Sequence, residues 1–287
     1  MKFLLAVDGS DQSYEAVRSL KYLCRAEALH IVHVLDVPTP AYPMMMQEVS
    51  QELYATVERN MREDGTRLLE RIVSLLPMGP GPVTKHLVVG SPGDQIVRLA
   101  EQYDVDLILL GTRGFGPIKE RLVGSVAHRV LTYGPGAKMI LPVPMKSLDR
   151  ILLPLQGMTD ADHALHFLRQ KPFRDLPTIT LFTVLPQTQP PWPVDASSAE
   201  QMEVQTLRKA QGFLNDTAAT LDQMGYRTRV SAALGTPVEK ILEEAGAWSP
   251  DLILMGSRGR HGVTRMALGS VSHALLHQGS YPLMVFG

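Results

Sequence analysis

The sequence is poor in cysteine. Cys24 is the only one among 287 residues, which excludes an internal disulfide and a thiolate metal site. No apolar run reaches the roughly 20 residues that a membrane-spanning helix needs. Strand-like sequence follows directly after Met1 and Lys2, so we expect no signal peptide. Together these absences predict a protein of the reducing cytoplasm.

The chain also lacks an excess of either charge. Its 28 lysines and arginines nearly balance 29 aspartates and glutamates. Such a balance supplies no basic field for nucleic acid, and no basic amphipathic helix is present to anchor the chain on a membrane. A serine nucleophile elbow and a cysteine paired with a base are absent too, so the sequence predicts no catalytic residue. No metal-ligating set is predicted either.

An internal repeat is the most informative feature that is present. A glycine motif in the first half reads Gly111-Thr-Arg-Gly114, then nine residues, then Gly124-Ser125. It recurs 145 residues later as Gly256-Ser-Arg-Gly259, then nine residues, then Gly269-Ser270. The apolar segment before the first motif, Asp106–Leu109, recurs at the same offset as Asp251–Leu254. The N-terminal segment Phe3–Gly9 matches Ile151–Gly157 at an offset of 148. The chain is therefore a tandem duplication.

The pattern of each copy predicts its fold. Short apolar runs alternate with segments of helical periodicity, such as the predicted helix Asp11–Arg25, and this alternation is typical of βαβ units. We expect an α/β protein of two tandem doubly wound domains, residues 1–145 and 148–287, each with a parallel sheet flanked by helices. Ligands of such sheets bind beyond the carboxyl ends of the strands. Asp8 follows the first predicted strand and Gly111 follows the fourth. We therefore expect both residues to lie at the ligand-binding edge of the first sheet.

The glycine motif has the chemistry of an anion site. Gly111 and Gly114 allow backbone conformations closed to other residues and let a ligand approach the main chain. Arg113 lies between them and can pair with phosphate oxygens. Gly124 and Ser125 open a helix, whose free N–H groups and partial positive charge favour an anion. Asp8 can accept hydrogen bonds from ribose hydroxyls across the crevice.

A second interpretation stays open at this point. The glycines can simply terminate strands and form loops, or they can belong to a scaffold that has kept its fold without binding a ligand. The recurrence of the same spacing after a strand and before a helix favours the binding interpretation. A magnesium ion would arrive on the phosphates of a bound nucleotide rather than on a site of its own.

The motifs together resemble the universal stress protein family in its tandem two-domain form. The resemblance rests on a strand followed by Asp8-Gly9-Ser10 and on the Gly-x-x-Gly-x9-Gly-Ser pattern, and it covers the whole chain. It implies five-stranded parallel sheets of strand order 3-2-1-4-5. It also implies ATP or AMP as ligand in the branch that carries the motif. Association through the last strand is common in the family, which implies an intrachain pseudo-dimer through Met139–Val143 and Leu283–Phe286, or a homodimer.

The resemblance also implies two nucleotide-binding sets. The first comprises residues at the predicted strand ends, the glycine loop and the following helix start: Ala6, Asp8, Val34, Leu110, Gly111, Arg113, Gly114, Gly124, Ser125 and Val126. The second comprises their counterparts: Gln156, Val184, Met255, Gly256, Arg258, Gly259, Gly269, Ser270 and Val271. Gln156 stands where the first copy has Asp8, so we expect the second site to bind more weakly, to bind another ligand or to stay empty.

Three functions fit these sequence features. The favoured one is a nucleotide-dependent regulator of the stress response whose nucleotide state controls an unknown protein partner. An enzyme for slow ATP hydrolysis or nucleotidyl transfer in the same crevice is the second, although no residue is an obvious water-activating group. The third is an interaction scaffold that binds no nucleotide.

Overall fold

The computed structural model describes residues 1–37, 47–112, 124–186, 196–257, 269–278 and 281–287. The chain forms two compact units, residues 1–21 with 25–140 and residues 22–24 with 141–287. The boundary between the two units lies between residues 140 and 141. The domain limits expected from the repeat, at residues 145 and 148, stay a prediction. No helix among the described residues is long and apolar enough to cross a membrane.

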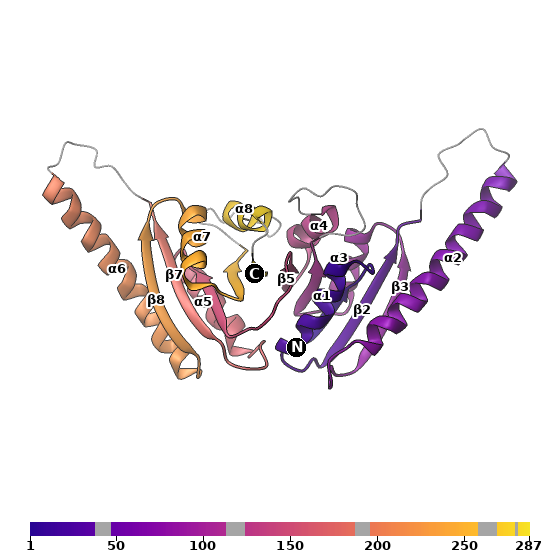
Figure 1. Cartoon of the computed structure of the whole chain (residues 1–287), viewed down its shortest axis with the longest axis horizontal. Helices are drawn as coiled ribbons and strands as arrows, with labels where there is room; N and C mark the ends of the chain where they lie inside the picture. The colour runs from indigo at the N-terminus through magenta and orange to yellow at the C-terminus, as the bar shows by residue number, and fades with distance from the viewer. Residues whose placement is uncertain (38–46, 113–123, 187–195, 258–268, 279–280) are drawn as a thin grey trace. The chain divides into compact units, whose positions relative to one another are not determined.

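The first unit alternates strands and helices, as the sequence predicts (Figure 1). Its elements are β1 (Lys2–Ala6), α1 (Asp11–Ser19), β2 (Ala28–Leu35), α2 (Gln47–Ser74), β3 (Val83–Val89), α3 (Pro92–Gln102), β4 (Leu107–Gly111), α4 (Ser125–Tyr133) and β5 (Ala137–Leu141). A 3₁₀ turn, Leu20–Tyr22, follows α1.

The second unit repeats the same order. Its elements are β6 (Arg150–Pro154), α5 (Met158–Arg169), β7 (Thr178–Leu185), α6 (Ala196–Gln223), β8 (Arg227–Leu234), α7 (Pro237–Trp248), β9 (Leu252–Gly256), α8 (Ser270–Gln278) and β10 (Leu283–Phe286). Each element corresponds to one of the first unit, so the duplication read from the sequence extends to every helix and strand named here.

The strand order confirms the predicted fold class. The first unit runs β3-β2-β1-β4-β5, and the second runs β8-β7-β6-β9-β10, which is the expected order 3-2-1-4-5 in each. The pairings β1–β2, β1–β4 and β2–β3 are parallel, and so are β6–β7, β6–β9 and β7–β8. The order reverses beside the first strand of each unit, which is where doubly wound sheets bind ligands.

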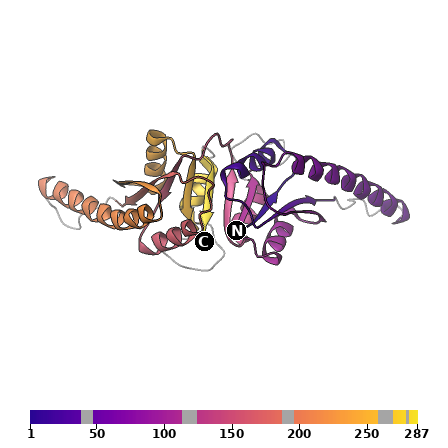
Figure 2. The same ribbon diagram turned by 90° about the horizontal axis from the view of Figure 1, so that it is seen from below.

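Burial explains why these segments form central strands. Four of the five residues in β1 and in β4 are buried, and Leu4, Leu5, Ile108 and Leu109 have no exposed surface. Strands buried on both faces are expected where helices cover both sides of a parallel sheet. In the first unit α3 packs on α4, and Arg71 of α2 lies over the Tyr14 ring of α1 at 5.3 Å. Figure 2 shows these two helix pairs on opposite faces of the sheet.

The first helix is shorter than the sequence predicted. The predicted segment Asp11–Arg25 is helical only to Ser19 and then tightens into the 3₁₀ turn. Leu20 and Leu23 are both buried, so the apolar spacing that suggested a longer helix continues across the change of geometry. The helix begins as predicted, because Ser10 is its N-cap and its hydroxyl accepts the backbone N–H of Ser13 at 3.3 Å.

Gly111 is required for space rather than for an unusual backbone angle. It is not among the glycines with positive φ, so the expectation of a conformation closed to other residues is wrong for this position. A Cβ at Gly111 would lie 2.6 Å from Cβ of Gln12 and 2.9 Å from its carbonyl carbon. At the matching Gly256, the nearest atom to a Cβ is Asp160 Oδ1 at 3.3 Å. The close approach of α1 to the end of β4 therefore depends on Gly111.

Two histidines of the first unit form a pair, of which His30 is buried and His86 partly buried. His30 of β2 is 7% exposed, its Nδ1 lies 3.0 Å from Nε2 of His86 on β3, and its ring stacks on Tyr103 at a centroid distance of 4.2 Å. Burial, with the nearby charge of Lys2, lowers the pKa of His30. Burial, with the neighbouring His30, lowers the pKa of His86. Both imidazoles are thus favoured in their neutral forms.

We expect the matched glycines to respond differently to alanine. Gly111→Ala forces α1 away from β4 and should destabilise the first unit by about 1–3 kcal/mol. Gly256→Ala needs a shift of only a few tenths of an ångström and should change the second unit's stability by less than about 1 kcal/mol. Pulse-labelling hydrogen exchange in urea, read on peptides from each unit, measures both. Equal losses in the two units would contradict this account.

The histidine pair makes the first unit sensitive to acid. Folded-state pKa values below the unfolded value of about 6.5 mean that the unfolded chain binds protons that the folded chain does not. Stability should therefore fall as the pH drops below about 6.5, and His30→Phe should reduce that dependence. The same hydrogen-exchange measurement on β2 at pH 7.5 and 5.5 tests this. His166→Gln, at an exposed histidine of α5, is the control and should leave the dependence unchanged.

Candidate functional site

A pocket of about 440 Å³ opens at the carboxyl ends of β1, β2 and β4. Its volume falls within the range of about 300–1,000 Å³ that is usual for ligand sites. Eight predicted residues line it: Ala6, Asp8, Val34, Leu110, Gly111, Gly124, Ser125 and Val126. Two others, Arg113 and Gly114, lie outside the described residues. The structure thus brings together the strand end and the helix start that the sequence placed about 115 residues apart.

Asp8 is held at the pocket by its own chain. Its Oδ1 accepts the backbone N–H of Ser10 at 2.9 Å and the Ser10 hydroxyl at 2.6 Å. Gly9 between them has a φ of 81°, a left-handed conformation that glycine adopts without strain. No hydrogen bond from a described residue reaches Oδ2. The carboxylate is therefore oriented through one oxygen and keeps the other for a donor in the pocket.

The opposite side of the pocket is the start of α4. Gly124 is its N-cap, with an extended backbone and no capping side chain. The Gly124 N–H donates to the carbonyl of Thr112 at 2.9 Å, which ties the helix start to the end of β4. The N–H groups of the first helical turn have no intrahelical acceptor. Those of Ser125 and Val126 and the Ser125 hydroxyl are donors suited to an anion.

The structure adds residues that the sequence analysis missed. Val32, Asp36, Pro92, Ile96 and Ser13 also line the first pocket. Val32 and Asp36 flank the predicted Val34 at intervals of two along β2 and its extension, so they face the same side. That periodicity was the signal that could have found them. Pro92 and Ile96 lie one helical turn apart on α3 and were predicted only as part of a helix.

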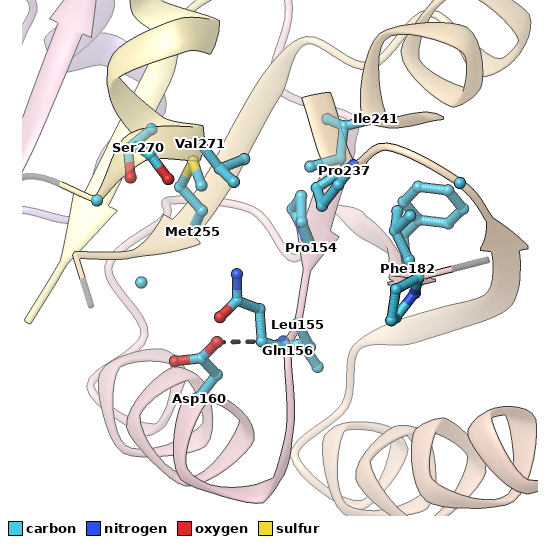
Figure 3. A pocket seen from close by; sticks show the side chains of 16 residues that line it. Pro154, Leu155, Gln156, Asp160, Phe182, Pro237, Ile241, Met255, Ser270 and Val271 are labelled. Atoms are coloured by element: carbon cyan, nitrogen blue, oxygen red, sulfur yellow. Dashed lines mark hydrogen bonds between the residues drawn. The ribbon is translucent and has the colours of Figure 1, made fainter. Parts of the chain in front are cut away.

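A second pocket, of about 250 Å³, occupies the matching place in the second unit (Figure 3). Seven predicted residues line it: Gln156, Val184, Met255, Gly256, Gly269, Ser270 and Val271. Arg258 and Gly259 lie outside the described residues. Fourteen lining positions of the two pockets correspond when the offsets of 148, 150 and 145 residues are applied to their respective segments. The repeat thus reproduces a pocket as well as a fold.

Three exchanges account for the smaller second pocket. Phe182 takes the place of Val32, Pro154 that of Ala6, and Pro186 that of Asp36. The first two add side-chain volume to the lining, and the third removes a carboxylate from it. The second pocket is consequently smaller than the first and lacks the counterpart of Asp36.

Asp160 lines the second pocket and was not predicted. It lies in the first turn of α5, where its Oδ2 accepts the backbone N–H of Gln156 at 3.1 Å (Figure 3). Burial raises its pKa above the ordinary value, while the Gln156 N–H and the charge of His163 act in the opposite direction. The second pocket therefore contains an acidic group although Gln156 has replaced the strand-end aspartate.

No group of three or more histidine, cysteine or acidic side chains suited to a metal ion occurs within the described ranges. His273 and His277, one turn apart on α8, have their Nε2 atoms 3.1 Å apart. The sequence analysis did not single out this pair. Magnesium, if it accompanies a nucleotide, would have to rely on phosphate oxygens for most of its ligands.

Comparisons with known proteins agree with the tandem duplication. A family model described as the universal stress protein family matches residues 1–136 and again residues 147–287. The universal stress protein Rv2005c of Mycobacterium tuberculosis is 24% identical over 305 residues, covering 98% of this chain and 95% of that protein. MJ0531 of Methanocaldococcus jannaschii, also named a universal stress protein, is 26% identical over 145 residues, which cover 50% of this chain and 84% of that protein.

A solved structure supports the fold. The crystal structure of a universal stress protein from Archaeoglobus fulgidus matches with a TM-score of 0.65 at 22% identity, covering 99% of this chain and 97% of that one. The two family matches fall one on each half and together span nearly the whole sequence. The chain therefore belongs to the universal stress protein family, in its tandem two-domain form.

Proposed function

We propose that the chain binds ATP or AMP in its first pocket and acts as a nucleotide-dependent regulator of the stress response. One observation carries the proposal: the Asp8 carboxylate and the uncapped start of α4 face the same pocket. A ribose phosphate presents hydroxyl donors at one end and a negative charge at the other. The pocket offers the complementary groups in the same arrangement.

The other residues that line the first pocket can be matched to the parts of a nucleotide. Val34 and the neighbouring Val32 and Ile96 supply an apolar wall for a base. Ala6, Leu110 and Gly111 form the floor between the two polar ends, and Arg113 and Gly114 continue the proposed phosphate loop. A charge-assisted hydrogen bond contributes about 1.5–3 kcal/mol. A few such bonds, after ordering costs, would support micromolar affinity, about −8 kcal/mol.

The second pocket is proposed as a weaker site of the same kind. Gly256, Gly269, Ser270 and Val271 repeat the phosphate end, with Arg258 and Gly259 in the corresponding loop. Val184 repeats part of the apolar wall, Met255 repeats part of the floor, and Gln156 stands at the ribose end. Its smaller volume favours weaker binding than in the first pocket.

The proposed regulatory role follows from what the site contains and from the family. A site that binds a nucleotide without a positioned base suits a switch whose bound state changes contacts with a protein partner. We infer a cytoplasmic location from the single cysteine. Association through Met139–Val143 and Leu283–Phe286, within the chain or between two copies, stays a prediction of the family resemblance.

Asp8→Asn tests the ribose end of the first pocket. The amide oxygen can still accept the Ser10 N–H, so the loop should keep its shape, while the charge available to a ribose hydroxyl is lost. We expect the affinity for ATP to fall about five- to tenfold, measured by isothermal titration calorimetry. Asp11→Asn, at an exposed acid in the first turn of α1, is the matched control and should bind like the unaltered chain. Equal affinities for all three proteins would refute the assignment of Asp8.

Phosphate release separates the regulator from an enzyme. With saturating ATP and magnesium, we expect less than one phosphate per chain over the time of a binding experiment, because the sequence analysis identifies no obvious water-activating group. Multiple turnovers that disappear in Arg113→Ala would show that the pocket is an ATPase site. Absence of binding by ATP and by AMP would instead favour a scaffold without nucleotide.

A further inference from the structure

An acid and an amide have exchanged positions between the two units. The backbone N–H of Val7 donates to Val32 and that of Leu155 to Phe182, so the two strand ends are aligned at an offset of 148 residues. With that alignment, Asp8 and Gln12 of the first unit correspond to Gln156 and Asp160 of the second. The second unit has the carboxylate four residues later, in the first turn of the helix instead of after the strand.

The packing at the glycine loop supports the same correspondence. The residue nearest to a Cβ built on Gly111 is Gln12, and the residue nearest to one built on Gly256 is Asp160. Asp160 Oδ1 lies 3.3 Å from that position. Its carboxylate is therefore beside the start of the glycine motif, at the edge of the pocket that Gly256 and Gln156 also line.

We propose that Asp160 replaces the strand-end aspartate as the hydroxyl acceptor of the second pocket, so that this pocket binds a phosphorylated ribose ligand in its own right. The inference rests on the proposed function, because it takes the phosphate end of the pocket to be shared with the first site. It corrects the expectation that the second site is weak for want of a carboxylate.

The geometry of Asp160 parallels that of Asp8. Each carboxylate is oriented by a backbone N–H of its own loop: Ser10 donates to one Asp8 oxygen at 2.9 Å and Gln156 donates to Asp160 Oδ2 at 3.1 Å. In each case no hydrogen bond from a described residue reaches the other oxygen. In Figure 3 the Gln156 side chain points into the pocket toward Met255 and Ser270, with Asp160 beside its backbone. Amide and carboxylate thus border the same space.

Helix capping alone does not account for a charged residue at this position. Asp160 accepts the N–H of the residue just before the N-cap of α5, which is a capping contact. In the first unit Ser13 makes the equivalent contact, since its hydroxyl accepts the N–H of Gly9 at 3.1 Å. A neutral hydroxyl therefore suffices to cap the helix. The half-buried carboxylate of Asp160 bears a desolvation cost that capping does not require.

The narrow second pocket limits which ligand fits. Its volume is about 250 Å³ against about 440 Å³ in the first pocket, because Phe182 and Pro154 replace smaller residues. The probes are therefore AMP and ribose 5-phosphate, which share a phosphorylated ribose and differ in the base. Binding of both would indicate that the sugar phosphate is recognised. Binding of AMP alone would indicate that the wall around Phe182 also holds the base. Either result supports the proposal.

The experiment uses the full chain and four variants. Asp160→Asn keeps an acceptor for the Gln156 N–H, so α5 should remain capped. Gln156→Asp with Asp160→Gln restores the arrangement of the first unit. Gln156→Asp alone places two carboxylates side by side. Asp8→Asn reports on the first site. Calorimetry with AMP and with ribose 5-phosphate gives affinity and stoichiometry, and protection of α8 amides from hydrogen exchange identifies the second site.

We expect two ligands per unaltered chain with at least one probe. Asp160→Asn should weaken binding at α8 at least fivefold and leave the first site unchanged, and the double exchange should restore it. Gln156→Asp alone should bring no gain. The proposal is overturned if α8 shows no protection while the first site fills, if Asp160→Asn binds like the unaltered chain, or if Gln156→Asp alone strengthens binding. A chain that binds neither AMP nor ATP at either site overturns the proposed function as well.

Discussion

The structure depends on one constraint: a parallel sheet whose strand order reverses must leave a gap beside its first strand. Side chains at the carboxyl ends of β1 and β4 border that gap, and the helix after β4 begins there with its N–H groups unpaired. A carboxylate and a set of amide donors are thereby held on two sides of one pocket. Neither group needs a long side chain to reach into the pocket, so the ligand that we propose would be held mainly by main-chain groups.

Duplication allowed the two pockets to diverge within a constant framework. The strand order, the helix starts and the glycine spacing are the same in both units. The changes that alter the pockets include Phe182 for Val32 and Gln156 for Asp8, and the second pocket gains Asp160. Because the backbone that supports the phosphate end is unchanged, differences in ligand would arise from size and from the placement of one carboxylate.

The sequence predicted the fold and most of the pocket because those features have local signatures. Buried strands, glycine spacing and the repeat are visible in the sequence without coordinates. Because the chain is duplicated, the strand pattern and the glycine spacing each occur in both copies. It did not predict Asp36 or Asp160, since each becomes a pocket residue only when a strand extension or a helix start is placed against the glycine loop. The space requirement at Gly111 was equally hidden, because it arises from α1, which lies about 100 residues earlier in the chain.

A crystal structure of the chain grown with saturating AMP tests the central claim most directly. The account predicts ribose hydroxyls within hydrogen-bonding distance of the Asp8 carboxylate and the phosphate against the first turn of α4. A nucleotide bound elsewhere on the first unit, or a first pocket without nucleotide under those conditions, would contradict it.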